Sequence, residues 1–321
     1  AVARADANVV TAVSLGEATI TARLGSTAVQ GDVTAKVVET ITYPNVFIDG
    51  LDPGLDYGSF GYGQYLEAFS IDGTGGVGGS AAIKINIPAG RFAGGAIFST
   101  VGGRDLSGFD ALVFDARSDQ ASYDLAEVGY GIGMAFGGTE YQAAITGVQL
   151  TTDWREVIIP LPDPARLTDE PGVFYYSTGQ AGNVWMDNVR FVELDAGVVT
   201  NPRPVMDTAS VDALLGEVVT IGGTTTTYDI EGADVTAIHT SGYLTYFSSD
   251  EAVVSTEGGV VTAVGGGSAT VTAKLIDTDV AGEVTVSVIA PPAEPAPAPT
   301  HDEADVISIY SDAYTDITVD T

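Results

Sequence analysis

Short runs of alternating apolar and polar residues recur along most of the chain. Two early examples are residues 19–24 (TITARL) and 33–37 (VTAKV), in which every second side chain is apolar. Such a period of two is typical of a strand with one buried face. Helical periodicity is almost nowhere sustained, and glycine is abundant, with 40 residues. The sequence therefore predicts an all-β protein.

The middle of the chain, between residues 43 and 194, predicts its own set of strands. Turn residues separate them, and their spacing suits a β-sandwich or jelly roll of about 150 residues. If residues 174–176 are extended, alternation places Tyr175 on the opposite face from Phe174 and Tyr176. The predicted strands are residues 45–48, 81–87, 111–116, 128–135, 141–145, 155–160 and 184–192.

The two flanks carry an internal repeat. Residues 9–37 align without gaps on residues 260–288, a constant offset of 251, and 17 of the 29 positions are identical. Both copies contain VVTAV followed by G-x-A-T-x-T-A. This pattern resembles the bacterial Ig-like group 2 domain. The resemblance implies small β-sandwiches that act as spacers in secreted and surface proteins.

The chain is accordingly predicted to be multidomain, with a central jelly-roll β-sandwich between flanking Ig-like β-sandwich domains. The first repeat copy holds only closing strands, and the natural protein is expected to continue beyond residue 321. The predicted parts are residues 1–40 (a partial Ig-like domain), 41–196 (the jelly roll), 204–290 (a whole Ig-like domain), 291–304 (a proline-rich linker) and 305–321 (the start of a further domain).

Several pieces of the middle segment together resemble the carbohydrate-binding modules of galactose-binding-like jelly-roll type. They are FIDG at 47–50, GGSAAIKI at 78–85, DLSGFDALVFDARS at 105–118, DWREVIIPL at 153–161 and VWMDNVRF at 184–191. The resemblance implies glycan binding and a structural Ca²⁺ held by Asp49, Asp72 and Asp187. The alternative for Asp49 and Asp187 is a role as turn or cap residues.

A glycine-rich stretch at residues 56–65 (DYGSFGYGQY) concentrates four aromatic rings. A flat ring presented on such a connection can stack on the C–H face of a sugar at little entropic cost. One or two of the rings could instead close the end of the sandwich core. The predicted ligand-binding residues are Tyr57, Phe60, Tyr62, Gln64, Tyr65, Glu67, Arg104, Tyr130, Glu140, Tyr141 and Gln142.

The net charge of the chain limits the classes of ligand that it is expected to bind. Acidic residues outnumber basic ones 43 to 12, giving a net charge of −31, which repels nucleic acid, anionic membranes and polyanionic glycans. Cysteine is absent, so disulfides and thiol chemistry are excluded. No apolar run of about 18 residues suggests a membrane span. The expected ligand is a neutral β-glucan such as laminarin, and the expected protein is an extracellular or surface-exposed monomer.

Enzyme activity is not predicted for this chain. A glycosidase needs two carboxylates across the scissile bond, and no E-x-D-x-x-E run is present. The two histidines, His239 and His301, accompany no nucleophile motif. The sequence thus predicts a non-catalytic glycan-binding fragment, which could belong to a larger protein carrying a glycoside hydrolase. The alternative is a structural adhesin or stalk without a glycan ligand.

Overall fold

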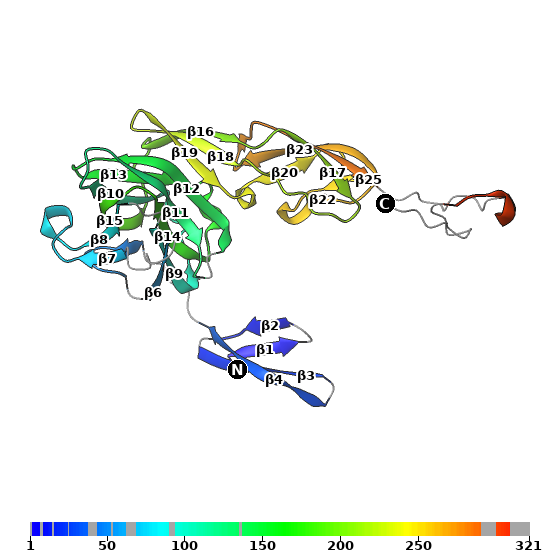
Figure 1. Cartoon of the computed structure of the whole chain (residues 1–321), viewed down its shortest axis with the longest axis horizontal. Helices are drawn as coiled ribbons and strands as arrows, with labels where there is room; N and C mark the ends of the chain where they lie inside the picture. Colours follow the sequence, from blue (N-terminus) through cyan, green and yellow to red (C-terminus); the bar gives the residue numbers. More distant parts are fainter. Residues whose placement is uncertain are drawn as a thin grey trace.

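A computed structural model of the chain describes residues 2–6, 9–14, 16–24, 26–37, 44–52, 54–61, 69–89, 94–134, 137–289 and 300–308. These residues form β-strands and short 3₁₀ helices, as the sequence predicts (Figure 1). Nowhere in these ranges is there a helix with the length and apolar character needed to cross a bilayer. The 3₁₀ helices are η2 (Val77–Gly79), η3 (Pro164–Arg166), η4 (Ser241–Tyr243), η5 (Glu257–Gly259) and η6 (Glu303–Asp305).

Two antiparallel sheets form a sandwich in the middle of the chain, here called the central sandwich. One sheet is six-stranded, and β5 joins it by pairing with β15. Its strands are β13 (Arg155–Pro160), β10 (Ala111–Ser118), β15 (Gly182–Val192), β8 (Ala82–Ile87), β7 (Phe69–Asp72) and β5 (Asn45–Phe47).

The opposing sheet is eight-stranded and extends beyond the central sandwich. Five of its strands belong to the central sandwich, and three come from the C-terminal region, defined here as residues 199–289 (Figure 1). In spatial order the strands are β16 (Val199–Val205), β18 (Thr225–Ile230), β19 (Ala233–His239), β12 (Gly138–Leu150), β11 (Tyr123–Ile132), β14 (Glu170–Thr178), β9 (Gly94–Arg104) and β6 (Leu55–Gly61).

Aromatic rings fill the space between the two sheets of the central sandwich. Phe98 and Phe174 are fully buried with ring centroids 5.5 Å apart, and Phe114 lies 5.7 Å from Phe174. The expectation for residues 174–176 is confirmed, because Phe174 and Tyr176 belong to the main core while Tyr175 belongs to a separate cluster on the opposite face. Burial of these large rings supplies much of the stability of the sandwich.

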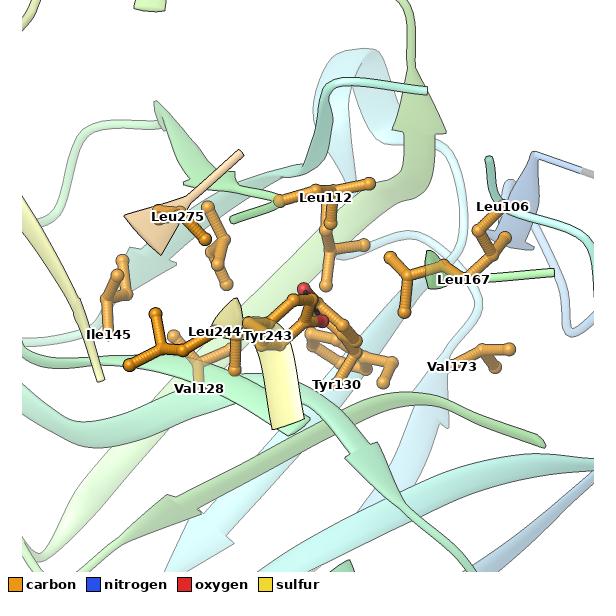
Figure 2. Packing of buried hydrophobic residues seen from close by; sticks show 14 of the residues in the cluster. Leu106, Leu112, Val128, Tyr130, Ile145, Leu167, Val173, Tyr243, Leu244 and Leu275 are labelled. Atoms are coloured by element: carbon orange, nitrogen blue, oxygen red, sulfur yellow. Dashed lines mark hydrogen bonds between the residues drawn. The ribbon is translucent and has the colours of Figure 1, made fainter. Parts of the chain in front are cut away.

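The core continues from the central sandwich into the C-terminal region. The Tyr243 side chain is fully buried, and its hydroxyl lies 2.7 Å from the hydroxyl of Tyr130 and donates to the carbonyl of Tyr141 at 2.5 Å. Leu244 and Leu275 belong to the same buried cluster (Figure 2). We refer to this boundary, where β12 pairs with β19, as the seam.

The C-terminal region also contains a sheet of its own. Its β17 runs parallel to β25, and the other pairs are antiparallel. The strands are β17 (Ala209–Leu214), β25 (Val284–Ile289), β23 (Gly267–Leu275), β20 (Thr245–Ser248) and β24 (Thr278–Asp279), with a separate pair of β21 (Val254–Ser255) and β22 (Thr262–Ala263).

The internal repeat corresponds to the same hairpin in both copies. Strands β3 (Gly16–Leu24) and β4 (Thr27–Val37) pair in the register of β23 and β25 after a shift of 251 residues. The environments differ: Leu24 and Val33 are 82% and 66% exposed, whereas Leu275 and Val284 are each 2% exposed. The difference arises because β23 and β25 have further neighbours in β20 and β17. The remaining strands, β1 (Ala3–Asp6) and β2 (Val9–Ala12), form a two-stranded sheet.

Two glycine-rich segments are strands where the sequence predicts none. Residues 56–61 were expected on a connection but lie in β6, and residues 94–104 form the long strand β9. Strand β9 pairs with β14, which carries Phe174, Tyr175 and Tyr176, and β6 pairs with β9 at the edge of the sheet, so pairing with neighbouring strands compensates for the low strand preference of glycine. Most of the predicted linker (residues 291–304) and of the predicted start of a further domain (residues 305–321) lies outside the described residues.

Candidate functional site

The outer face of the eight-stranded sheet is the side turned away from the main core. Residues directly opposite each other in an antiparallel pair project to the same face, so the register defines a row across the sheet. Each strand contributes one residue: Gly58, Ile97, Tyr175, Gly129, Ala144, Ile238, Thr225 and Val205. The row contains small residues at Gly58, Gly129 and Ala144 and larger ones at Ile97, Tyr175 and Ile238.

A polar cluster lies beside this row on β11, β14 and β12. The Tyr175 hydroxyl donates to Glu127 Oε1 at 2.7 Å and accepts from Gln142 Nε2 at 3.0 Å. Burial raises the pKa of Tyr175, so its hydroxyl is neutral at physiological pH and keeps the proton that it donates. Glu127 and Gln142 are themselves half-buried, and each therefore presents polar atoms toward solvent.

A small cavity opens at this cluster, directly on the seam. It encloses about 220 Å³. Its lining combines Glu127, Gln142 and Tyr175 of the central sandwich with Ile238 of β19, among others. Ala144 also lines the cavity, and with Ile97 and Tyr175 it forms a buried apolar cluster against which Ile132 packs. A lining that combines apolar side chains with a few polar groups is usual for a small-molecule site.

His239 supports the seam beneath the cavity. Its Nε2 lies 3.0 Å from Thr226 Oγ1 and its Nδ1 lies 3.0 Å from the carbonyl of Thr240. Because a carbonyl only accepts, Nδ1 carries the proton and Nε2 accepts from the hydroxyl. Burial lowers the pKa of His239, which keeps the ring neutral. His239 therefore has a structural role.

The glycine-rich aromatic stretch is only partly visible in the structure. The Tyr57 ring packs 4.6 Å from Phe69 and 6.2 Å from Phe98, which places it on the core side, with 48% of its surface exposed. Phe60 pairs with Gly95, and its side chain is outside the described residues. The predicted ligand residues Tyr62, Gln64, Tyr65 and Glu67 also lie outside the described residues.

The prediction is wrong for two of the ligand residues, because their side chains are fully buried. Tyr130 has no exposed surface and its hydroxyl is bonded to Tyr243, so its ring cannot stack on a sugar. Arg104 also has no exposed surface, and its guanidinium donates to the Asn45 carbonyl and to Asp52 at 3.3 Å. Both side chains hold the fold together.

The other predicted residues of β12 lie around the seam. The Tyr141 ring packs 5.4 Å from the Tyr243 ring and remains half-buried. Glu140 is exposed, and its carbonyl accepts from the Thr240 hydroxyl at 2.5 Å. Gln142 belongs to the polar cluster described above. Of the predicted set, Gln142 is thus the described residue that lines the cavity.

The glycine-rich turn after β7 is held by Asp187, one of the predicted calcium ligands. Asp187 Oδ2 accepts from the Val77 amide at 2.9 Å and from Ser80 Oγ at 2.8 Å, while Oδ1 accepts from the Asn188 amide at 2.7 Å. A calcium ion needs six to eight oxygens whose lone pairs are available. Two donors already use the lone pairs of Oδ2, so Asp187 is arranged to accept hydrogen bonds.

Of the other two predicted calcium ligands, Asp72 also accepts hydrogen bonds, whereas Asp49 is exposed. Asp72 accepts from Trp185 Nε1 at 2.9 Å and from the Thr74 amide at 3.2 Å, and the Trp185 bond is the main reason that its pKa is lowered. Asp49 is exposed in a turn with φ of 54°. Across the described ranges, no group of three or more His, Cys, Asp or Glu side chains could hold a metal ion. The hydrogen bonds at Asp72 and Asp187 do not favour calcium there, and calcium binding by the predicted set stays a prediction.

Comparison with known proteins found similarity to solved structures but not to family models or curated proteins. No protein-family model matches the chain, and no curated protein matches it. A family 30 carbohydrate-binding module of a Clostridium thermocellum cellulosomal cellulase is 17% identical, with 48% of this chain and 95% of that chain covered and a TM-score of 0.32. A family 11 module from the same organism is 12% identical, covering 48% of this chain and 97% of that chain with a TM-score of 0.33.

An enzyme is also among the similar structures. A β-1,2-glucanase from Parabacteroides distasonis is 11% identical, with 78% of this chain and 39% of that chain covered and a TM-score of 0.31. Identities and TM-scores this low transfer no ligand and no activity to this chain. Its function has to be inferred from its own residues.

Proposed function

We propose that this chain is a non-catalytic glycan-binding fragment whose central sandwich binds a neutral polysaccharide, with a β-glucan such as laminarin as the first choice. The observation that carries this proposal is the cluster of Glu127, Tyr175 and Gln142 in the lining of the cavity. A carboxylate accepts from sugar hydroxyls, and an amide both donates and accepts. Ile238 lines the same cavity and is 47% exposed, so it offers apolar surface to the C–H face of a sugar ring.

The electrostatics favour a neutral glycan over an acidic one. The chain carries a net charge of −31, and Glu127 adds a carboxylate at the cavity itself. Uronate or sulfate groups would be repelled at long range and at contact. A neutral ligand and an extracellular or cell-surface location fit this surface best.

Catalysis is not part of this proposal. Burial raises the pKa of Glu170 to about 7, a property that glycosidases use in their acid catalysts. However, Glu170 is 2% exposed, and its oxygens accept from the Gly172 amide at 2.8 Å and from Thr139 Oγ1 at 2.9 Å. Both carboxyl oxygens are thus engaged by donors inside the protein, and this proposal gives Glu170 a structural role.

A structural stalk is the second candidate function. The eight-stranded sheet and the core both run through the seam, and this continuity is what a stiff spacer needs. A stalk does not require a ligand-binding cavity, so a binding experiment distinguishes the two candidate functions.

Isothermal titration with laminarin, cello-oligosaccharides and alginate tests the proposal. We expect heat with at least one of the neutral glycans and none with alginate. Gln142→Ala should weaken binding about three- to ten-fold, the value of one hydrogen bond to a ligand. Gln149→Ala, an exposed position on the same strand, is the matched control and should bind as the wild type does. If no neutral glycan gives heat or shifts the protein in an affinity gel, the stalk is the better description.

A further inference from the structure

We propose that strands β19, β18 and β16 extend the glycan-binding face, so that one neutral glycan chain lies across the strands and continues from the central sandwich onto Ile238 and Val205. This inference rests on the proposed function. It gives the C-terminal region, which the sequence predicts to be a spacer, a direct part in recognition.

The register is the first support. Ala144 of β12 pairs with Ile238 of β19, Ile238 pairs with Thr225 of β18, and Thr225 pairs with Val205 of β16. Because paired residues share a face, these side chains continue the row that passes beneath the cavity. A ligand that follows the row therefore meets the C-terminal region without leaving the sheet.

Exposure is the second support. Within the row, Ile97, Tyr175 and Ala144 are buried, whereas Ile238 and Val205 are 47% and 43% exposed. The apolar surface that a sugar ring could cover thus lies on β19 and β16. Isolated exposed apolar side chains are common on proteins, but these two lie in one line with the cavity.

The surroundings of these two residues are polar and contain paired charges. Arg203 shares the face of β16 and β18 and forms ion pairs with Asp229 at 2.7 Å and Asp234 at 2.6 Å. A polar border around apolar contacts is the usual composition of a recognition surface. It also leaves no unpaired positive charge there to attract an acidic sugar.

The seam is held firmly enough to keep one ligand in contact with both parts. The Thr240 amide donates to the Gln142 carbonyl at 3.0 Å, and Arg166 Nη2 donates to Thr245 Oγ1 at 3.1 Å. Together with the buried Tyr130–Tyr243 bond, these contacts fix the added strands against β12. A preorganised surface binds without a further cost in ordering.

The added face is long enough to change which ligands bind best. Three strand spacings separate β12 from β16, which corresponds to about 14 Å. The five strands of the central sandwich span about 19 Å on the same measure. We therefore expect the affinity to keep rising with glycan length beyond what the central sandwich alone can contact.

The test is a titration of the full chain with neutral oligosaccharides from tri- to octasaccharide, using the linkage that binds in the polysaccharide assay. Ile238→Thr and Val205→Thr keep β-branched side chains and should therefore fold. Val205→Thr should weaken octasaccharide binding about three- to ten-fold and leave trisaccharide binding unchanged, whereas Ile238→Thr should weaken both, because Ile238 also lines the cavity. Ile289→Thr, 58% exposed at the end of β25, is the control and should change neither.

The outcomes separate the two proposals. If the oligosaccharides bind and Gln142→Ala weakens them while Val205→Thr does not, the extended face is refuted. If the affinity does not rise with glycan length beyond the shortest oligosaccharides, the extended face is also refuted. If no ligand of any length binds, the proposed function itself is refuted.

Discussion

Glu170 allows a sharp test of the energetics of this fold. Its carboxyl is buried among uncharged partners, and desolvation raises its pKa from 4.5 to about 7. Arg104 lies opposite in the register, but its guanidinium hydrogen-bonds to Asn45 and Asp52. The carboxyl therefore keeps its proton in the folded state at pH values where the unfolded chain has lost it.

The size of the effect follows from proton linkage. Between pH 4.5 and about 7 the folded state binds more protons at Glu170 than the unfolded state, so the free energy of unfolding falls as the pH rises through this window. A change from 4.5 to about 7 corresponds to about 3 kcal/mol, since one pKa unit is about 1.4 kcal/mol. This contribution is fully present below pH 4.5 and lost above pH 7.

Glu170→Gln should remove this pH dependence. The amide oxygen can accept from the Gly172 amide, and the amide nitrogen can donate to Thr139 Oγ1, so no buried group is left unpaired. We expect the variant to match the wild type near pH 4.5 and to be up to about 3 kcal/mol more stable at pH 8.

Urea unfolding of both proteins from pH 4 to pH 9 measures this difference. Glu193→Gln, at an exposed position just after β15, should follow the wild type at every pH. A difference that does not vary with pH, or a glutamine variant that is less stable at pH 8, would refute the reasoning. It would mean that Glu170 is ionised in the folded protein and stabilised by a cation.

Two further predictions concern the seam and the glycine turn. Tyr243→Phe should lower the free energy of unfolding by about 1–3 kcal/mol, because it leaves Tyr130 and the Tyr141 carbonyl without their buried partner. In the same urea experiment Tyr57→Phe, at a position that is 48% exposed, should change it little, and equal effects would contradict the structural role of the seam. EDTA should leave the melting temperature unchanged, since N–H and O–H donors already hold Asp72 and Asp187. A fall that added Ca²⁺ reverses would establish the calcium site.

The sequence predicts the strands well where one face is strictly buried. Strands β8, β10, β13 and β15 lie close to their predicted ranges, because each is a short run rich in large apolar residues, which alternate with polar ones most clearly in β8. The face assigned to Tyr175 follows from the same alternation. By contrast, β6 and β9 depend on packing against neighbouring strands, and glycine-rich sequences carry little information about such neighbours.

The seam is beyond what the sequence alone can predict. Alternation shows which face a residue takes but not which strand lies beside it. Residues 143 and 239 are far apart in the chain, and nothing near either one indicates that they pair. For the same reason Tyr130 was predicted as a ligand residue, since its buried partner Tyr243 comes from the other side of this pairing. Glu127, which the sequence did not single out, could be found only after β11, β12 and β14 had been placed together.

The unbroken sheet has a mechanical consequence. In multidomain chains joined by flexible linkers, tension applied to one end first extends a linker, so little of the force reaches the binding surface. Here the same pull reaches the cavity directly through the hydrogen bonds between β12 and β19, of which the register records only two residue pairs. Tension along the C-terminal region would therefore act on the pairing of Ala144 with Ile238, and under the proposed function the affinity for a glycan would depend on force as well as on concentration.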